Sequence, residues 1–190
     1  MQVNNLCKSF GNKDLLVDVS FNLHDGNKVG LVGKNGTGKS TLLKILSGLL
    51  NADSGKINLN GKTIKLLKQE IEKKYDNYSV TEYIKHDNGV LELETRLHEL
   101  ESNLTDENME EYGEVLDAFL KINGYDFDTN LEMIVNGLNM DIDLNSKVST
   151  LSGGQKIKVL LASVLLSNAD ILLLDEPTNN LDIEAIEWLE

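Results

Sequence analysis

The 190-residue sequence has little cysteine, few basic residues and no long apolar run, and each scarcity excludes a class of protein. The single cysteine, Cys7, can form no internal disulfide and has no companion cluster for a metal site. Its 18 Lys and Arg residues against 31 Asp and Glu residues give a formal net charge of -13. Such a chain does not coat nucleic acid through charge, so any contact with nucleic acid must be local.

The apolar runs are too short to span a membrane. The longest, VLLASVLL at 159–166, falls well below the roughly 20 residues that a spanning helix needs. The start, MQVNNLCKSF, lacks the basic and then apolar pattern of a secretory signal. An apolar content of 41% and a charged content of 26% are typical of a folded soluble domain. We therefore expect a cytoplasmic protein without membrane insertion.

The first third of the sequence reads as strands around one helix. Apolar and β-branched runs predict strands, and the helical spacing of TLLKILSGLL predicts a helix that stops at Gly48. The expected strands cover 1–8, 15–23, 27–32, 55–61 and 63–69. After Gln69 the composition becomes acidic and helical.

Residues 90–122 predict a helical hairpin, because apolar residues recur there every three or four positions on either side of a polar TDEN break. Thr105 is the expected N-cap of the second helix. The hairpin carries ten acidic residues against Arg96 and Lys121, a pattern typical of a solvated face.

The last third returns to alternating helix and strand. Helices are expected near 128–138, after Ser152 and after Asp182, and the apolar run 171–174 predicts a buried strand. This alternation favours an α/β fold with a mostly parallel sheet covered on both faces.

GKNGTGKS at 33–40 follows an apolar run and precedes a helix, which is the context of a phosphate-binding loop. Gly33, Gly36 and Gly38 permit the turn whose N–H groups surround a phosphate. Lys39 would reach the outer phosphates, and the Ser40 hydroxyl would contact Mg²⁺. An incidental glycine-rich hairpin is the alternative, which this context disfavours.

Two carboxylates complete a candidate hydrolase site. The apolar strand delivers Asp175 to its carboxyl end, where it could hold Mg²⁺ through water. Glu176 follows and could act as the general base that activates the attacking water. Without the loop at 33–40, the same two acids would be read as a helix cap.

LSGGQ at 151–155 poses a separate question, because a serine and two glycines open a helix whose unpaired N–H groups suit an anion. Taken alone, Ser152 is better read as an N-cap beside a flexible hinge.

Together, GKNGTGKS, LSGGQ and DEPTNNLD, in this order, resemble the nucleotide-binding domain of ATP-binding cassette (ABC) proteins. The resemblance implies an ABC-type P-loop fold with an antiparallel β subdomain, and ATP and Mg²⁺ as ligands. It places Phe10 against adenine, Gln69 as a sensor of Mg²⁺ and the γ-phosphate, and Asp182 in the D-loop. The ATP-binding set is then Phe10, Gly33, Lys34, Asn35, Gly36, Thr37, Gly38, Lys39, Ser40 and Thr41.

In this family the signature segment contacts the ATP of a partner domain, which implies a second ABC domain. The resemblance assigns that contact to Ser152, Gly153, Gly154 and Gln155. Where the family commonly has arginines in the following helix, this chain has Lys156, Lys158 and Ser163.

Two features resemble the first domain of ABC-F proteins: the long stretch between Gln69 and Leu151, and the sequence GYDFDTNLEMIVNGL within it. That family is soluble, carries two ATPase domains in one chain and acts on the ribosome. By this resemblance, residues 1–190 form one nucleotide-binding domain, which contains an inserted arm at 90–122 and a signature helical region at 123–169. Because the acidic arm would be repelled by RNA, a basic ribosomal protein surface is its expected contact.

The resemblance implies a switch histidine that contacts the γ-phosphate. His24, His86 and His98 stand elsewhere in the sequence, so this histidine is expected beyond Glu190. We therefore expect a C-terminally incomplete domain of low activity. The alternatives are the ATPase subunit of a membrane transporter and a module that binds ATP without hydrolysing it. Whether an ABC-F protein of this kind regulates translation or protects against antibiotics is left open.

Overall fold

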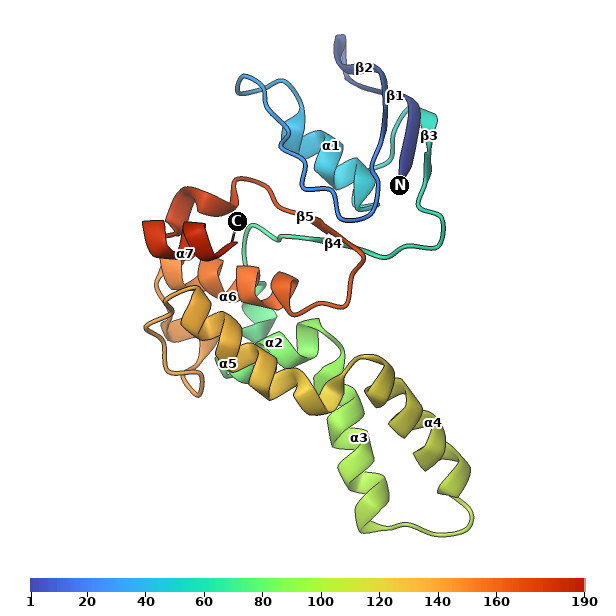
Figure 1. Cartoon of the computed structure of the whole chain (residues 1–190), viewed down its shortest axis with the longest axis vertical. Coiled ribbons are helices and arrows are strands. Elements are labelled where there is room, and N and C mark those ends of the chain that lie inside the picture. The colour runs from blue at the N-terminus through green and yellow to red at the C-terminus, as the bar shows by residue number, and fades with distance from the viewer. Residues whose placement is uncertain (190) are drawn as a thin grey trace. The chain divides into compact units, whose positions relative to one another are not determined.

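The computed structural model describes residues 1–189, which form two compact units. The first unit combines Met1–Leu66 with Ala169–Asp175. The second combines Leu67–Asn168 with the segment that begins at Glu176. Each unit has its own secondary structure (Figure 1) and its own buried hydrophobic residues.

Of the elements in residues 1–189, unit 1 holds the five named strands and one α-helix. Its elements are β1 (Gln2–Phe10), β2 (Lys13–Asn22), α1 (Lys39–Leu46), β3 (Ser54–Asn58), β4 (Ile64–Leu66) and β5 (Ile171–Leu173). β1 pairs antiparallel with both neighbours in a sheet of order β2-β1-β3, and β4 pairs in parallel with β5. The antiparallel part matches the β subdomain that the sequence predicted.

The antiparallel sheet is irregular where β1 meets β3. The register shifts between Asn4 and Cys7, and Asn5 has a left-handed φ of 49°. Gly55 lies opposite this shift with a φ of +99°, and a Cβ on it would stand 2.6 Å from both the Asn5 carbonyl oxygen and the Leu6 Cα. Only glycine allows the two backbones to approach this closely.

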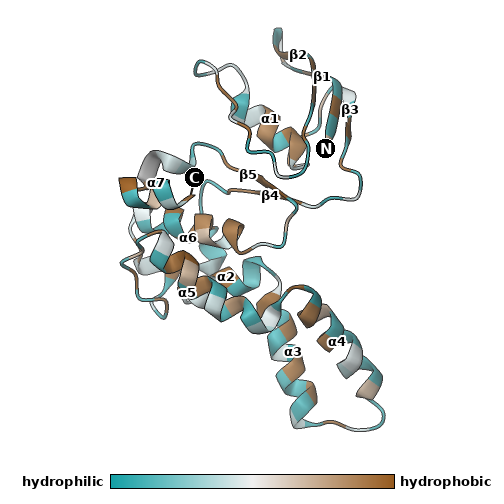
Figure 2. Ribbon diagram, in the orientation of Figure 1, coloured by the Kyte–Doolittle hydropathy of each residue, from teal (hydrophilic) through white to brown (hydrophobic). Residues whose placement is uncertain are grey.

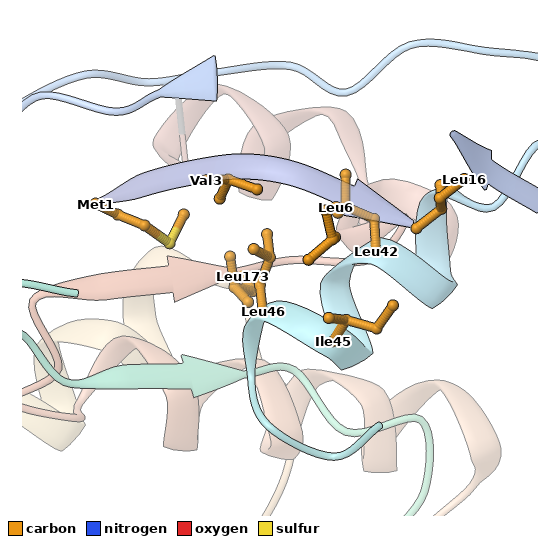
Figure 3. Packing of buried hydrophobic residues seen from close by; sticks show 8 residues of the cluster. All are labelled: Met1, Val3, Leu6, Leu16, Leu42, Ile45, Leu46 and Leu173. Atoms are coloured by element: carbon orange, nitrogen blue, oxygen red, sulfur yellow. The ribbon is translucent and has the colours of Figure 1, made fainter. Parts of the chain in front are cut away.

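The core of unit 1 lies between β1, α1 and β5 (Figure 3). Leu173 of β5 is buried there with residues from the beginning of the chain. The buried cluster consists of Met1, Val3, Leu6, Leu16, Leu42, Ile45, Leu46 and Leu173. Since α1 buries one apolar face in this cluster, the position of its N-terminus is fixed by packing.

The expected strand at 27–32 is wrong, because this run makes no ladder in the structure. Its apolar side chains Val29, Leu31 and Val32 are exposed, Val32 at 93%. An apolar run shows that a segment can be a strand, but strand formation also needs a hydrogen-bonding partner, and the parallel pair here is formed by β4 and β5.

Unit 2 is helical. Its elements are η1 (Lys73–Tyr75), α2 (Val80–Asp87), α3 (Val90–Ser102), α4 (Met109–Lys121), η2 (Gly124–Asp126), α5 (Phe127–Gly137), η3 (Val148–Thr150), α6 (Gly153–Leu165), η4 (Pro177–Asn180) and α7 (Ile183–Leu189). α6 is its central helix, with an uninterrupted buried run from Val159 to Val164.

Helices α3 and α4 lie side by side as a hairpin within unit 2 (Figure 1). Each alternates hydrophobic and hydrophilic residues along its length (Figure 2), and Leu97, Leu100 and Phe119 are buried. Arg96 of α3 reaches Glu111 of α4, with 2.7 Å from Nε to Oε1.

Thr105 does not cap the second helix. α4 begins at Met109 with Asn108 in the N-cap position. The Asn108 side chain instead accepts a hydrogen bond from the Thr105 N–H at 2.8 Å and donates one to the Asn103 carbonyl oxygen at 2.9 Å. This local turn competes with a helical start at 105, because short amide side chains readily bond nearby backbone.

Among residues 1–189, no helix is both long and apolar enough to cross a membrane.

Candidate nucleotide-binding site

The loop at 33–38 is shaped by its glycines and by local hydrogen bonds. Gly36 and Gly38 have φ values of 79° and 97°, which residues other than glycine rarely adopt. The Thr37 hydroxyl donates to the Lys34 carbonyl oxygen at 2.9 Å and so closes the turn. The exposed segment 33–37 can therefore approach a phosphate group with its backbone.

Lys39 lies across this loop. Its ammonium donates to the carbonyl oxygens of Gly33 at 2.9 Å and Lys34 at 3.2 Å. These contacts bring a positive charge to the segment whose backbone N–H groups would bind an anion.

Helix α1 starts directly at Lys39, so Ser40 and Thr41 occupy its first turn. Gly38 is the N-cap and supplies no side-chain cap, which leaves the first N–H groups of the helix without that partner. A Cβ on Gly38 would stand 2.9 Å from Leu15 Cγ, so the loop passes tightly over β2. The N-terminus of α1, the positive end of its dipole, therefore adjoins the loop at 33–38.

Asp175 and Glu176 follow β5, as the sequence predicted. Leu173 is anchored in the core of unit 1, and Asp175 is the last residue that belongs to this unit. Glu176 is exposed and has a left-handed backbone, with φ 49° and ψ 51°, immediately before Pro177. A residue before proline is already restricted, so this conformation is unusual and marks the position.

Phe10 and Gln69 are both accessible. Phe10 ends β1 with 52% of its surface exposed, so it is not a core residue. The Lys8 ammonium lies 5.5 Å from the centroid of its ring. Gln69 is exposed in a bend of unit 2, after β4.

The signature segment forms a capping box at the start of α6. The Ser152 hydroxyl oxygen accepts a hydrogen bond from the Gln155 N–H at 3.3 Å, and the Gln155 side-chain oxygen accepts one from the Ser152 N–H at 2.9 Å. The N-cap interpretation of Ser152 is therefore correct. The cap leaves Gly153 and Gly154 in the first turn, with open space where a Cβ would lie.

Asp182 caps the next helix and binds α6. Its Oδ1 accepts a hydrogen bond from the Ala185 N–H at 2.9 Å, and its Oδ2 lies 3.3 Å from the Lys158 ammonium. The backbone hydrogen bond from Ala185, together with Lys158, holds the pKa of Asp182 below its usual range. Lys158 also donates to the Leu138 and Asn139 carbonyl oxygens, each at 2.9 Å. Sequence reasoning noted Lys158 but could not identify its partners Leu138, Asn139 and Asp182.

The ABC transporter family model matches residues 16–179, a span that runs from β2 past Glu176. The chain belongs to the ABC transporter family. Proteins of this family bind ATP, so the loop at 33–40 lies in an ATP-binding cassette domain.

Curated relatives of the cassette include members of the F branch. Energy-dependent translational throttle protein EttA of Mycobacterium tuberculosis is 36% identical over 96% of this chain and 34% of its own length. ABC transporter F family member 2 of Arabidopsis thaliana is 32% identical over 100% of this chain and 30% of its own length. Uncharacterized ABC transporter ATP-binding protein YkpA of Bacillus subtilis is 36% identical over 99% of this chain and 36% of its own length. The predicted resemblance to ABC-F proteins is confirmed, and the chain spans about a third of each relative.

Solved structures confirm the predicted ABC-type α/β fold. An ATP-binding subunit of an ABC transporter superimposes with a TM-score of 0.72 at 22% identity, covering 99% of this chain and 70% of the other. A putative ABC transporter ATP-binding protein from Pyrococcus furiosus gives 0.66 at 26% identity, covering 99% and 82%.

Proposed function

We propose that this chain is the first ATPase domain of an ABC-F-type protein that acts on the ribosome. The observation that carries ATP binding is the loop at 33–38, where two left-handed glycines lead into α1 and Lys39 lies across the turn. Membership of the ABC transporter family supports ATP as the nucleotide.

The oxygen donors of the cassette fit magnesium. Ser40 offers a hydroxyl and Asp175 a carboxylate, and both belong to unit 1. Hard oxygen ligands of this kind suit Mg²⁺, which binds through few protein groups and keeps phosphate and water in its shell. Gln69 would add an amide oxygen. When bound, Mg²⁺ neutralises phosphate charge during phosphoryl transfer.

Glu176 is the proposed general base. Its carboxylate would accept the proton of the water that attacks the γ-phosphate, while Lys39 and the loop N–H groups stabilise the charge that develops on the phosphate. The left-handed backbone at Glu176 supports a functional role, because such strain is kept where the position of a side chain matters.

We further propose that the active form needs a second ABC domain. Ser152, Gly153, Gly154 and Gln155 would present the start of α6 to an ATP held by that partner. Because the capping box fixes the side chains of Ser152 and Gln155, the first-turn backbone is ready to meet a γ-phosphate without reordering. Asp182 would belong to the same contact surface.

The ribosome is proposed from the relatives and from the hairpin. One relative is named an energy-dependent translational throttle protein, and the same alignment includes the α3–α4 hairpin at 90–122. With ten acidic and two basic residues, this hairpin suits a basic protein surface better than RNA. We propose a cytoplasmic protein whose two domains close on ATP and open after hydrolysis.

The test uses the full-length protein that contains this chain. Glu176→Gln, combined with the same change in the second domain, blocks proton transfer and should trap the ATP-bound state. We expect this variant to cosediment with ribosomes in ATP and not in ADP, and steady-state phosphate release to fall by about 10²-fold or more.

ATP binding without ribosome association would contradict the proposed role in translation. That outcome would favour the second candidate, the ATPase subunit of a membrane transporter, which the Pyrococcus furiosus structure supports at 26% identity. Copurification with a membrane subunit would then decide between the two. If the unsubstituted protein binds ATP but releases no phosphate, it is a module that binds ATP without hydrolysing it.

A further inference from the structure

Gln69 is flanked by two attachments to the same helix, α2. On one side, the ammonium of Lys68 lies 2.5 Å from Asp87 Oδ1, at the last residue of α2. On the other, the Tyr75 ring meets the Tyr83 ring at 5.4 Å and the His86 ring at 5.1 Å between centroids. The segment from Lys68 to Tyr75 is therefore tied to α2 at both of its ends.

The same end of α2 is attached to the middle of the signature helix. The Ser163 hydroxyl donates to Asp87 Oδ2 at 2.6 Å. The neighbouring Asn88 amide lies 3.1 Å from the Ser163 carbonyl oxygen and also donates to the Ile84 carbonyl oxygen at 2.9 Å. Ser163 is fully buried, so these bonds form where water does not compete.

A third contact joins α2 to the hairpin. Lys85 is 9% exposed, and its ammonium lies 3.0 Å from both Glu94 oxygens of α3 and 3.1 Å from Asp128 Oδ2 of α5. Burial lowers the pKa of Lys85, but the hydrogen bonds to the two carboxylates more than offset this and raise it. α2 thus connects the segment around Gln69, the hairpin and the signature helix within unit 2.

We propose that Lys68 is a positioning residue for ATP hydrolysis, which acts by coupling the segment around Gln69 to the signature helix α6 through Asp87. The carboxylate of Asp87 is the shared element, because one oxygen faces Lys68 and the other faces Ser163. A shift of Gln69 is then transmitted to α6 through two short polar contacts. This inference rests on the proposed ATPase function.

The test compares lysines of the same segment in the full-length protein. Lys68→Met removes the charge but keeps much of the side-chain volume, and it should fold because Lys68 is 44% exposed. We expect kcat for ATP hydrolysis to fall about two- to five-fold, in line with a partly exposed ion pair, while Kd for ATP stays within about twofold. Lys68→Arg keeps the cation and should restore kcat.

Lys73→Met is the matched control, because Lys73 is an exposed lysine of the same segment. It should leave kcat unchanged. Equal losses in the Lys68→Met and Lys73→Met variants would contradict the proposal. A selective rise in Kd for ATP would also contradict it, since Lys68 would then bind nucleotide directly.

Hydrogen exchange of this chain without nucleotide tests the coupling separately. Because coupling is reciprocal, Ser163→Ala should speed exchange of amides 68–72, and Lys68→Met should speed exchange in the middle of α6, each about two- to five-fold. If the unsubstituted protein hydrolyses no ATP, the proposed function fails and exchange alone decides the coupling. Unchanged exchange in both variants would overturn the inference.

Discussion

At the scale of single residues, two glycines in different surroundings show how backbone and space set the cost of a side chain. Gly55 has a positive φ, and a Cβ on it would stand 2.6 Å from the backbone of Asn5 and Leu6. Gly113 lies within α4, has no positive φ and has open space where a Cβ would be. The same substitution should therefore have opposite effects at the two positions.

Gly55→Ala should lower the free energy of unfolding of unit 1 by about 2 kcal/mol or more, because neither backbone can move aside. Gly113→Ala should raise the stability of the hairpin by roughly 0.5–1 kcal/mol, because alanine favours helix. Urea unfolding of this chain by circular dichroism, with hydrogen exchange of the β1 amides for unit 1, measures both. A stable Gly55→Ala variant would show that β3 does not approach β1 this closely.

The residue scale also shows which features could be foreseen. Gly36, Gly38 and Lys39 follow a fixed spacing before a helix, so their loop was predictable from local sequence. Lys68, Asp87 and Ser163 come from three separate segments, and no spacing rule joins them. The need for glycine at Gly55 depends on strand register, which is likewise set by partners far away in the chain.

At the scale of elements, the hairpin has buried apolar residues and an exposed ion pair, and we expect these to contribute unequally to its stability. Leu97 is 5% exposed between the helices, whereas Arg96 and Glu111 are each nearly half exposed. Burial removes apolar area from water, but solvent screens the ion pair.

Leu97→Ala should therefore destabilise the hairpin by about 2–4 kcal/mol, and Arg96→Ala by less than about 1 kcal/mol. Thermal unfolding followed by helical circular dichroism distinguishes the two, and Arg96→Lys serves as the control for charge. A larger loss for Arg96→Ala than for Leu97→Ala would mean that the ion pair orders the hairpin.

Prediction from sequence worked best for these elements. The spacing of apolar residues located α3, α4 and α5 because each helix buries one face against a neighbour. It failed at the start of α4, because the Asn108 side chain forms a local turn that delays the helix. It also failed at 27–32, because a strand needs a hydrogen-bonding partner and the composition of a segment does not show whether one is present.

At the scale of the whole molecule, the net charge of -13 is concentrated on the proposed arm. Glu110, Glu114 and Asp117 are exposed and recur at helical spacing along α4. If the arm meets a basic protein surface, these carboxylates attract it; if it meets RNA, they repel it.

We expect the combined variant Glu110→Gln, Glu114→Gln and Asp117→Asn to weaken the ATP-dependent association of the full-length protein with ribosomes several-fold. Glu132→Gln, which removes an exposed acid from α5, should have little effect. Binding titrations at two salt concentrations measure both variants. Tighter binding of the combined variant would assign the arm to RNA.

The parallel pair of β4 and β5 has a consequence for synthesis. Ile64 is registered with Ile171, and all of unit 2 before Glu176 lies between the two strands in the chain. As the polypeptide emerges from N to C, the apolar face that receives Leu173 stays open until Leu67–Asn168 of the helical unit has been made. Unit 1 thus closes late and through a contact of high sequence separation, so we expect its completion to be the slow and aggregation-sensitive step of folding.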